Sequence, residues 1–410
     1  MDDTTQSTWL NATVADLVEK YFCGPSPDCE ERQLYGDTEW GVLKTTAVSW
    51  SGWDATAHKV LPRSFWGQHD IEVQAGDILV TKAGPRNRVG VISHVTATPP
   101  HLVVSGKMIG LRPRRDSVLP EVLAGLLALK GPQKYIQERT TGMAESQVNF
   151  ANEVLLNTPV SVPPKTEQIA IARVANTLDA AIRQTEAIIE KLKQVKQGLL
   201  HDLLTRGIDA NGELRPPRFE APHLYKHSPI GWIPKEWDLA QLGKVAALQR
   251  GYDIVEANLV PGPYPVISSS GIVGYHRVST SRGPNVVVGR KGSIGTVHYV
   301  ETDFWAHDTS LFVTNFFGND ERFVFHLFSY LKLGQYGTKS GSPSLNRNDV
   351  HPLWIGRPSL DEQKVIVHAI TSHGNGMSRS VQELDKFKKL KFALMDDLLT
   401  GRVRATPLLP

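Results

Sequence analysis

Cysteine is nearly absent from this 410-residue sequence, which contains only Cys23 and Cys29. Two thiols cannot form a disulfide framework, and their spacing matches no zinc-binding pattern, so a reduced, cytoplasmic environment is expected. The acidic, polar start from Met1 to Thr5 is unlike a signal peptide, and no run of about 18 apolar residues is present to cross a membrane. The net charge is only +3, so any basic surface must be local.

Catalytic motifs are also missing. The 14 histidines are scattered without His-x-x-x-His or Cys-x-x-Cys spacing, so no metal site is expected. The glycine-rich stretch from Gly289 to Gly295 lacks the spacing of a phosphate-binding loop and favours a turn that presents two cations. His307 and Asp308 are adjacent, and adjacent side chains of a strand point to opposite faces, so no proton relay is expected. The sequence has no Asn-Pro-Pro-Tyr or Asn-Pro-Pro-Phe tetrapeptide and no glycine motif for S-adenosylmethionine, so it predicts neither an enzyme nor a cofactor.

One long stretch with helical periodicity, from Pro163 to Gly207, organises the chain. Thr166 is a suitable N-cap, and Gly207 is a stop signal. A heptad seam is expected, and it needs a partner helix to be buried. Its positions are Ile171, Val174, Leu178, Ala181, Thr185, Ile188, Leu192, Val195 and Leu199.

The partner helix is a second copy of the stretch, 195 residues further along. Pro163 matches Pro358, and Glu167-Gln168 matches Glu362-Gln363 without a gap. A repeat of this length indicates a duplicated half-protein and not a solenoid. Two glycines, Gly374 and Gly376, cost about 1 kcal/mol each relative to alanine, so a kink or break is expected in the second helix.

The two blocks before the helices resemble each other mainly at their edges. Trp237 and Gly251 echo Trp9 and Gly24. Strands are expected at 285–288 and 310–313, and a helix is expected over 321–333. The prolines of residues 208–236 argue against regular structure in the connector.

Cations are concentrated in glycine-flanked loops of both blocks. Such loops can approach a DNA groove, where arginine reads guanine and lysine contacts phosphate. For any one residue a solvated surface position is the commoner explanation, but two clusters on duplicated blocks favour DNA. The candidate DNA-contacting residues are Lys82, Arg86, Arg88, Arg112, Arg114, Arg290, Lys291, Lys339 and Arg347.

These motifs together resemble the specificity subunit of type I restriction–modification systems. The resemblance rests on both Pro-x-x-x-Glu-Gln stretches, on Leu203-Leu204-Thr205 and its second copy, on Gly231-Trp232-Ile233-Pro234, and on the stretch from Gly289 to Gly295. It implies a non-catalytic protein that assembles with two modification subunits and two ATP-dependent restriction subunits on double-stranded DNA. The modification partner would methylate adenine with S-adenosylmethionine. The sequence departs from the pattern at Gly374 and Gly376, and in an early region, 22–64, that has no match in the second block.

The expected fold is α+β, with two globular target-recognition domains separated by two long antiparallel helices that form a coiled-coil spacer with a pseudo-twofold repeat. Unlike domains on one spacer should read an asymmetric, two-part target with an unread gap. The alternatives are a nuclease or methyltransferase in its own right, and a coiled-coil scaffold that does not bind DNA. The expected boundaries are 1–162 and 237–357 for the recognition domains, 163–207 and 358–404 for the helical regions, and 208–236 for the connector.

Overall fold

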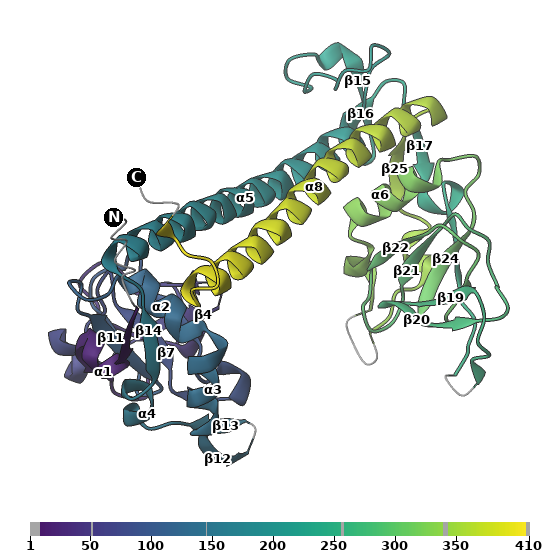
Figure 1. Ribbon diagram of the computed structural model, residues 1–410. Helices are drawn as coiled ribbons and strands as arrows, with labels where there is room; N and C mark the ends of the chain where they lie inside the picture. Colours follow the sequence, from purple (N-terminus) through teal and green to yellow (C-terminus); the bar gives the residue numbers. More distant parts are fainter. Residues whose placement is uncertain (1–8, 51, 145, 256–257, 339–342, 407–410) are drawn as a thin grey trace, which may run out of the picture. The chain divides into compact units, whose positions relative to one another are not determined.

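The computed structural model describes residues 9–50, 52–144, 146–255, 258–338 and 343–406. The chain divides into two compact units (Figure 1). Unit 1 contains the residues up to Gln184 together with those from Leu384 onward, and unit 2 contains Thr185–Glu383. Each unit therefore consists of a globular head and a part of each long helix. No helix within the described ranges is long and apolar enough to cross a membrane.

A four-stranded antiparallel sheet forms the centre of the unit 1 head, and β-branched and leucine side chains make up its strand β7. All four residues of β7 are buried, and helices α2 and α3 pack on the same core. In sheet order the strands are β2 (Val18–Phe22), β11 (Met108–Pro113), β7 (Ile78–Thr81) and β9 (Ile92–His94), and the helices are α2 (Pro120–Ala128) and α3 (Lys130–Glu138).

Small sheets and short helices complete unit 1, and the region 22–64 forms part of a separate small core. The paired strands are β1 (Leu10–Thr13) with β14 (Pro159–Val162), and β4 (Val48–Ser49) with β5 (Gly52–Trp53). Unit 1 also has two three-stranded sheets. The first has the strand order β10 (Leu102–Val103), β3 (Gly41–Leu43) and β6 (His58–Val60). The second has the order β12 (Thr141–Ala144), β13 (Gln147–Asn149) and β8 (Ala83–Gly84). The short helices are α1 (Val14–Leu17), α4 (Asn152–Leu156), η1 (Thr45–Ala47), η2 (Arg63–Phe65), η3 (His69–Ile71) and η4 (Arg86–Arg88).

Unit 2 has the same central sheet, again antiparallel and again covered by a helix. Asp320 caps α6 by accepting a hydrogen bond from Phe323 N at 2.9 Å. The strands expected at 285–288 and 310–313 and the helix expected over 321–333 are confirmed. In sheet order the strands are β18 (Ala247–Arg250), β24 (Ser310–Asn315), β21 (Asn285–Gly289) and β22 (Val297–Val300), and the helix is α6 (Glu321–Leu331).

The expectation of an irregular connector is wrong for its second half. The prolines at 216, 217 and 222 precede a hairpin, and Gly231, with φ of 100°, lets its turn close. The hairpin is β15 (Tyr225–Ser228) with β16 (Gly231–Pro234).

Two more sheets and four short helices belong to unit 2. One sheet pairs β17 (Asp238–Gln241) with β25 (Trp354–Arg357), and the other has the order β20 (Gly271–His276), β19 (Tyr264–Ser268) and β23 (Trp305–Ala306). The short helices are α7 (Arg347–Val350), η5 (Pro222–Leu224), η6 (Leu242–Lys244) and η8 (Leu333–Tyr336).

The two long helices are α5 (Lys165–Thr205) and α8 (Leu360–Leu399). The break expected at Gly374 and Gly376 is wrong, because α8 is helical through both glycines. A long helix can absorb a cost of about 1 kcal/mol per glycine, since hydrogen bonds continue on both sides. Contact with the other helix also supports this region, where His373 Nε2 lies 3.0 Å from Leu192 O within unit 2.

The expected heptad seam is confirmed at the buried residues Ile171 and Thr185, and Val174 packs on the unit 1 core, but the seam is wrong at Ile188 and Val195. Ile188 and Val195 are 52% and 47% exposed, whereas Ile189 is 7% exposed. In this heptad the second buried residue lies four residues after Thr185 and not three. A helix of 3.6 residues per turn brings both spacings near the same face, so sequence alone did not decide between them.

The Glu-Gln motif at the start of each long helix makes the same hydrogen bonds in both units. Gln168 Oε1 accepts from Leu119 N at 2.8 Å, and Gln168 Nε2 donates to Pro163 O at 2.9 Å. In unit 2 Gln363 Oε1 accepts from Asp320 N at 2.9 Å, and its Nε2 donates to Pro358 O at 3.0 Å. The two buried glutamines thus join each helix to its head in one way, and the internal repeat is confirmed.

Candidate nucleic-acid interface

One hairpin has the same backbone hydrogen bonds in both heads. In unit 1 it joins β7 to β9, and Gly90 N donates to Thr81 O at 2.8 Å. In unit 2 it joins β21 to β22, and Gly295 N donates to Gly289 O at 2.8 Å. Thr81 and Gly289 are therefore equivalent.

The next residue of each hairpin, Lys82 or Arg290, is anchored to a neighbouring loop in the same way. Lys82 N donates to Lys107 O at 2.8 Å, and Arg290 N donates to Thr309 O at 2.8 Å. Their own carbonyls accept from Phe150 N at 3.4 Å and from Leu345 N at 2.9 Å. Two positions after Phe150 and Leu345, the helices α4 and α7 begin at Asn152 and Arg347, which are therefore equivalent.

The glycines that follow β2 and β18 occupy a third equivalent position. A Cβ on Gly24 would lie 1.6 Å from Val104 O, and a Cβ on Gly251 would lie 2.2 Å from His307 O. Only glycine fits such a close backbone crossing. Just before these glycines the sequence has Cys23 in unit 1 and Arg250 in unit 2.

In unit 1 the three equivalent side chains meet one another. Lys82 Nζ donates to Asn152 Oδ1 at 2.9 Å, and Cys23 Sγ lies 3.8 Å from the same oxygen. Burial raises the pKa of the Cys23 thiol. This cluster carries one positive charge, on Lys82.

In unit 2 the same three positions are all arginines: Arg250, Arg290 and Arg347. Asp308 engages two of them, because its Oδ2 accepts from Arg250 at 2.8 Å and its backbone oxygen accepts from Arg290 at 3.1 Å. Partial burial lowers the pKa of the Arg290 guanidinium, and the nearby charge of Arg250 lowers it further. The like charges of Arg250 and Arg290, both bound to Asp308, favour an anionic partner, and DNA phosphates and guanine edges both supply acceptors.

His307 and Asp308 do contact each other, contrary to the expectation from strand geometry. His307 Nδ1 lies 3.2 Å from Asp308 Oδ1, because Asp308 is in the turn between β23 and β24 and not in a strand. The main partners of Asp308 are nevertheless Arg250 and Arg290, which both donate hydrogen bonds to it. Among the residues that the structure describes, no group of three or more His, Cys, Asp or Glu is placed to hold a metal ion.

Three of the candidate cations hold their own head together. Arg112 forms a two-pronged ion pair with Asp77, whose side chain is 1% exposed, at 2.8 and 2.9 Å. Arg88 donates to the carbonyls of Thr45 and Val48, both at 2.7 Å, and Arg114 donates to Val18 O at 3.1 Å. These partners lie far away in sequence, so the pattern of cations alone could not reveal them.

The other candidates differ in exposure, and Arg114 is itself exposed. Arg86 and Arg347 are exposed, and Lys82, Arg290 and Lys291 are partly exposed. Lys339 lies outside the described residues. Sequence reasoning missed Arg250 as a member of the cluster. The signal available was a cation directly before Gly251, the glycine that echoes Gly24.

Comparisons with known proteins agree with the resemblance stated above. The sequence matches the family described as "Type I restriction modification DNA specificity domain" over residues 6–194 and 234–386. It is 33% identical to the type I restriction enzyme EcoEI specificity subunit of Escherichia coli over 199 residues, which are 48% of this chain and 33% of that protein. It is 24% identical to the putative type I restriction enzyme MjaX specificity subunit of Methanocaldococcus jannaschii over 353 residues, 80% of this chain and 79% of that protein.

The fold is also found in solved structures. The S subunit of a type I restriction-modification system from M. genitalium superposes with a TM-score of 0.57 at 14% identity, covering 97% of this chain and 98% of that one. A chain from a study of complex assembly and conformational transition of the type I R-M system gives a TM-score of 0.55 at 14% identity, covering 95% and 97%. The two matched stretches of the family extend over more than half of the sequence. The chain therefore belongs to the type I restriction modification DNA specificity family, and it is a specificity subunit rather than an enzyme.

Proposed function

We propose that this chain recognises an asymmetric, two-part DNA target and directs partner subunits to methylate adenine and to restrict DNA with ATP. The observation that carries the proposal is a single backbone framework, present twice, with unlike side chains at equivalent positions. Unit 1 presents one lysine beside Cys23 and Asn152, whereas unit 2 presents three arginines. Different side chains on one framework read different bases.

Within each head, the proposed DNA contacts are the open cations of the anchored hairpins. Lys82 and Arg86 would serve unit 1, and Arg290, Lys291 and Arg347 would serve unit 2. Arg88, Arg112 and Arg114 would stabilise the loops of unit 1 through their bonds to Thr45 O and Val48 O, to the Asp77 carboxylate and to Val18 O. We propose the recognition domains at 1–162 and 237–357, the helical regions at 163–207 and 358–404, and the connector at 208–236.

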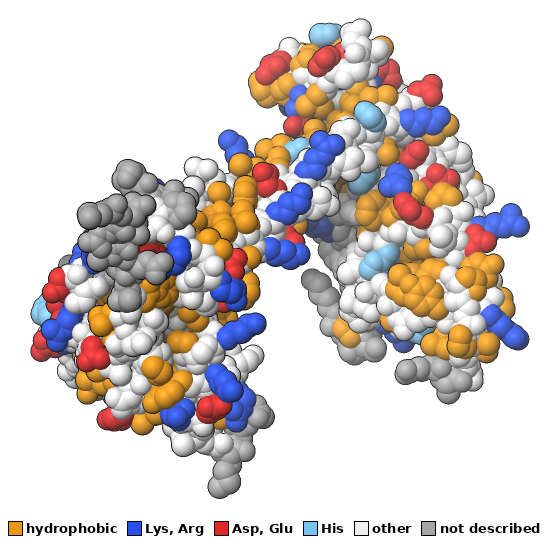
Figure 2. Space-filling model, viewed as in Figure 1, with side chains coloured by type: hydrophobic (Ala, Val, Ile, Leu, Met, Phe, Trp, Pro, Cys, Tyr) orange, Lys and Arg blue, Asp and Glu red, His pale blue; other side chains and the backbone are white. Residues whose placement is uncertain are grey.

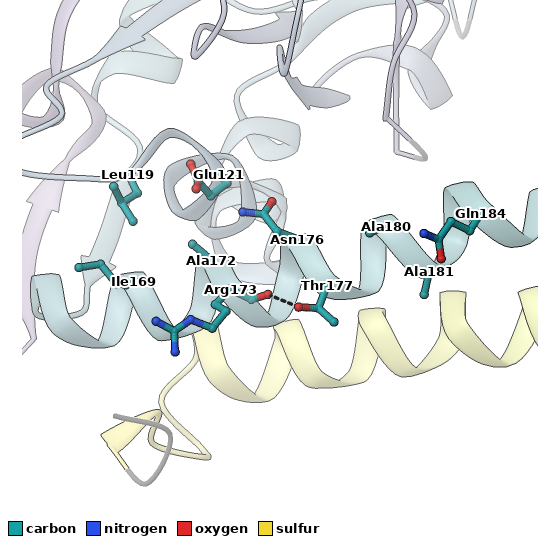
Figure 3. Close-up of a pocket in the computed structure, with 10 residues that line it drawn as sticks. All are labelled: Leu119, Glu121, Ile169, Ala172, Arg173, Asn176, Thr177, Ala180, Ala181 and Gln184. Carbon is teal, nitrogen blue, oxygen red and sulfur yellow. Dashed lines mark hydrogen bonds between the residues drawn. The ribbon is translucent and has the colours of Figure 1, made fainter. Parts of the chain in front are cut away.

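We propose that two modification subunits bind along the long helices, with two ATP-dependent restriction subunits completing the assembly. Apolar side chains remain exposed on these helices (Figure 2), namely Ile188, Val195, Val381, Leu390 and Phe392. Unit 1 also has an open groove of about 780 Å³ where α5 runs past the start of α2 (Figure 3). Its lining is Leu119, Glu121, Ile169, Ala172, Arg173, Asn176, Thr177, Ala180, Ala181 and Gln184. An assembly that acts on the cell's own DNA would work in the cytoplasm.

Exchanging one head should change one half of the target. Residues 238–357 are a natural block, because Asp238 pairs with Arg357 across β17 and β25 and the two cut points lie side by side. With the matching block of a relative, methylation mapping is expected to show one new half-target and one unchanged half. The reciprocal exchange of residues 10–162, bounded by the pair Leu10 and Val162, is the matched control and should change the other half. A simultaneous change of both halves would contradict the two-head proposal.

The purified chain should neither cleave nor methylate DNA, whether magnesium or S-adenosylmethionine is supplied. Adding the modification subunit should restore adenine methylation, which is the positive control. Turnover by the chain alone would favour the alternative of a DNA-modifying or DNA-cleaving enzyme. Sequence-selective binding that weakens steeply with salt would separate the proposal from a scaffold that does not contact DNA.

A further inference from the structure

Arg250 combines exposure with a fixed position, which is uncommon for a long, charged side chain. It ends β18, and its side chain is 56% exposed. One terminal nitrogen donates to Asp308 Oδ2 at 2.8 Å. A guanidinium has five N–H donors in a rigid fork, so this bond orients the group while most of its donors stay available.

The backbone around Arg250 is shaped to bring it to Asp308. Gly251 N donates to Ser310 O at 3.0 Å, and a Cβ at Gly251 would collide with His307 O at 2.2 Å. His307 Nδ1 lies 3.2 Å from the other carboxylate oxygen of Asp308. Its side chain is 19% exposed, so the ion pair lies at the edge of the head and not in its core.

We propose that Arg250 reads a guanine in the half-target of unit 2 and that Asp308 is its positioning residue. This inference rests on the proposed function. A guanidinium edge donates two parallel hydrogen bonds to O6 and N7 of guanine in the major groove, which is the commonest specific arginine contact with DNA. A phosphate is a poorer partner at this position, because the Asp308 carboxylate beside the fork would repel it.

The equivalent position in unit 1 strengthens the assignment. Cys23 is there, turned toward Asn152 and without an aspartate partner, since the residue equivalent to Asp308 is Gly106. The framework glycines Gly24 and Gly251 are shared, and the side chains just before them differ. A residue that varies on a shared framework is where two heads with unlike targets are expected to differ.

Arg250→Ala tests the inference in the full chain assembled with its modification subunit. Methylation mapping should show that one guanine of the unit 2 half-target is no longer required, with the unit 1 half unchanged. Methylation of the original target should fall by about 5- to 150-fold, the range for loss of one two-pronged base contact. Arg322→Ala is the matched control: Arg322 pairs with Glu301 at 2.7 Å in the same head, is 47% exposed, and should leave the motif unchanged.

Arg250→Lys separates base reading from charge. Lysine keeps the positive charge without the planar fork. The requirement for guanine at that position should therefore be relaxed, while the salt dependence of binding is retained. Asp308→Asn should weaken the preference for that guanine less than Arg250→Ala does, because the fork is present but less firmly held. Thermal unfolding of each variant verifies that the head remains folded.

Two results would overturn the inference. The first is an unchanged motif with a uniform loss of affinity and a shallower salt dependence, which identifies a phosphate contact. The second is wild-type behaviour of Arg250→Ala or Arg250→Lys. If instead the unaltered assembly methylates no two-part motif, the proposed function fails first, so the two failures are distinguishable.

Discussion

Replacing Glu362 with alanine should destabilise unit 2 by about 3–5 kcal/mol, because it leaves a buried guanidinium without its main partner. Arg215 is 4% exposed and binds both carboxylate oxygens of Glu362. The same carboxylate accepts from Trp237 Nε1 at 3.0 Å and from Ile208 N at 2.9 Å. The free energy of unfolding, measured by urea titration of the wild-type and variant chains, reports the loss.

Glu236→Ala provides the matched control. Glu236 contacts the same guanidinium, but its side chain is 69% exposed, so its removal should cost at most about 1 kcal/mol. Glu362→Gln should fall between the two, since it keeps an acceptor for Trp237 and loses the charge. Equal stabilities of Glu362→Ala and Glu236→Ala would show that the buried pair does not hold this region together.

The two copies of the Glu-Gln motif therefore have a structural role at the start of each long helix. Glu167 in unit 1 pairs with Arg404, and Glu362 in unit 2 pairs with Arg215. Arg404 follows the end of α8, and Arg215 follows the end of α5, so each glutamate pairs with an arginine that comes after the opposite long helix. The motif thus ties the start of one helix to the chain segment that leaves the other, and the heads are attached at that junction.

Much of this fold could be predicted from the sequence, because the signals were local or repeated. The 195-residue repeat located both helices, and the hydrogen bonds of Phe150 and Leu345 extend the same spacing back into the heads. The seam was correct only in part, since spacings of three and four residues both fit an α-helix and Ile188 lies beside Ile189.

The candidate site was less predictable, because the role of a cation depends on partners that are distant in sequence. Arg112 and Arg86 look alike in the sequence, yet Arg112 is bound by the buried Asp77, 35 residues away, and Arg86 is exposed. Arg250 went unnoticed because its position is defined by a backbone crossing at Gly251 and by Asp308, 58 residues away. Such pairings depend on tertiary contacts that no local pattern reports.

Inserting four residues into each long helix, after Gln184 in α5 and after Glu383 in α8, should widen the unread gap of the target by one or two base pairs. Both helices cross from one unit to the other at these points, so both must be lengthened. Four residues add about 6 Å and leave the helical face rotated by about 40°, close to the rise of about 6.8 Å for two base pairs. Methylation mapping of the assembled complex measures the gap.

Inserting two residues at the same points is the control, and it should abolish methylation of every two-part target. The added length is only about 3 Å, but each helix turns by about 200°, so its apolar seam points away from its partner. An insertion beside Gly207 would be a poorer test, because that glycine has φ of 66° and a Cβ there would lie 2.1 Å from Glu362 Oε1. The insertion alters the length of the helices. An unchanged gap in the four-residue variant would therefore mean that helix length does not set the spacing between the two half-targets.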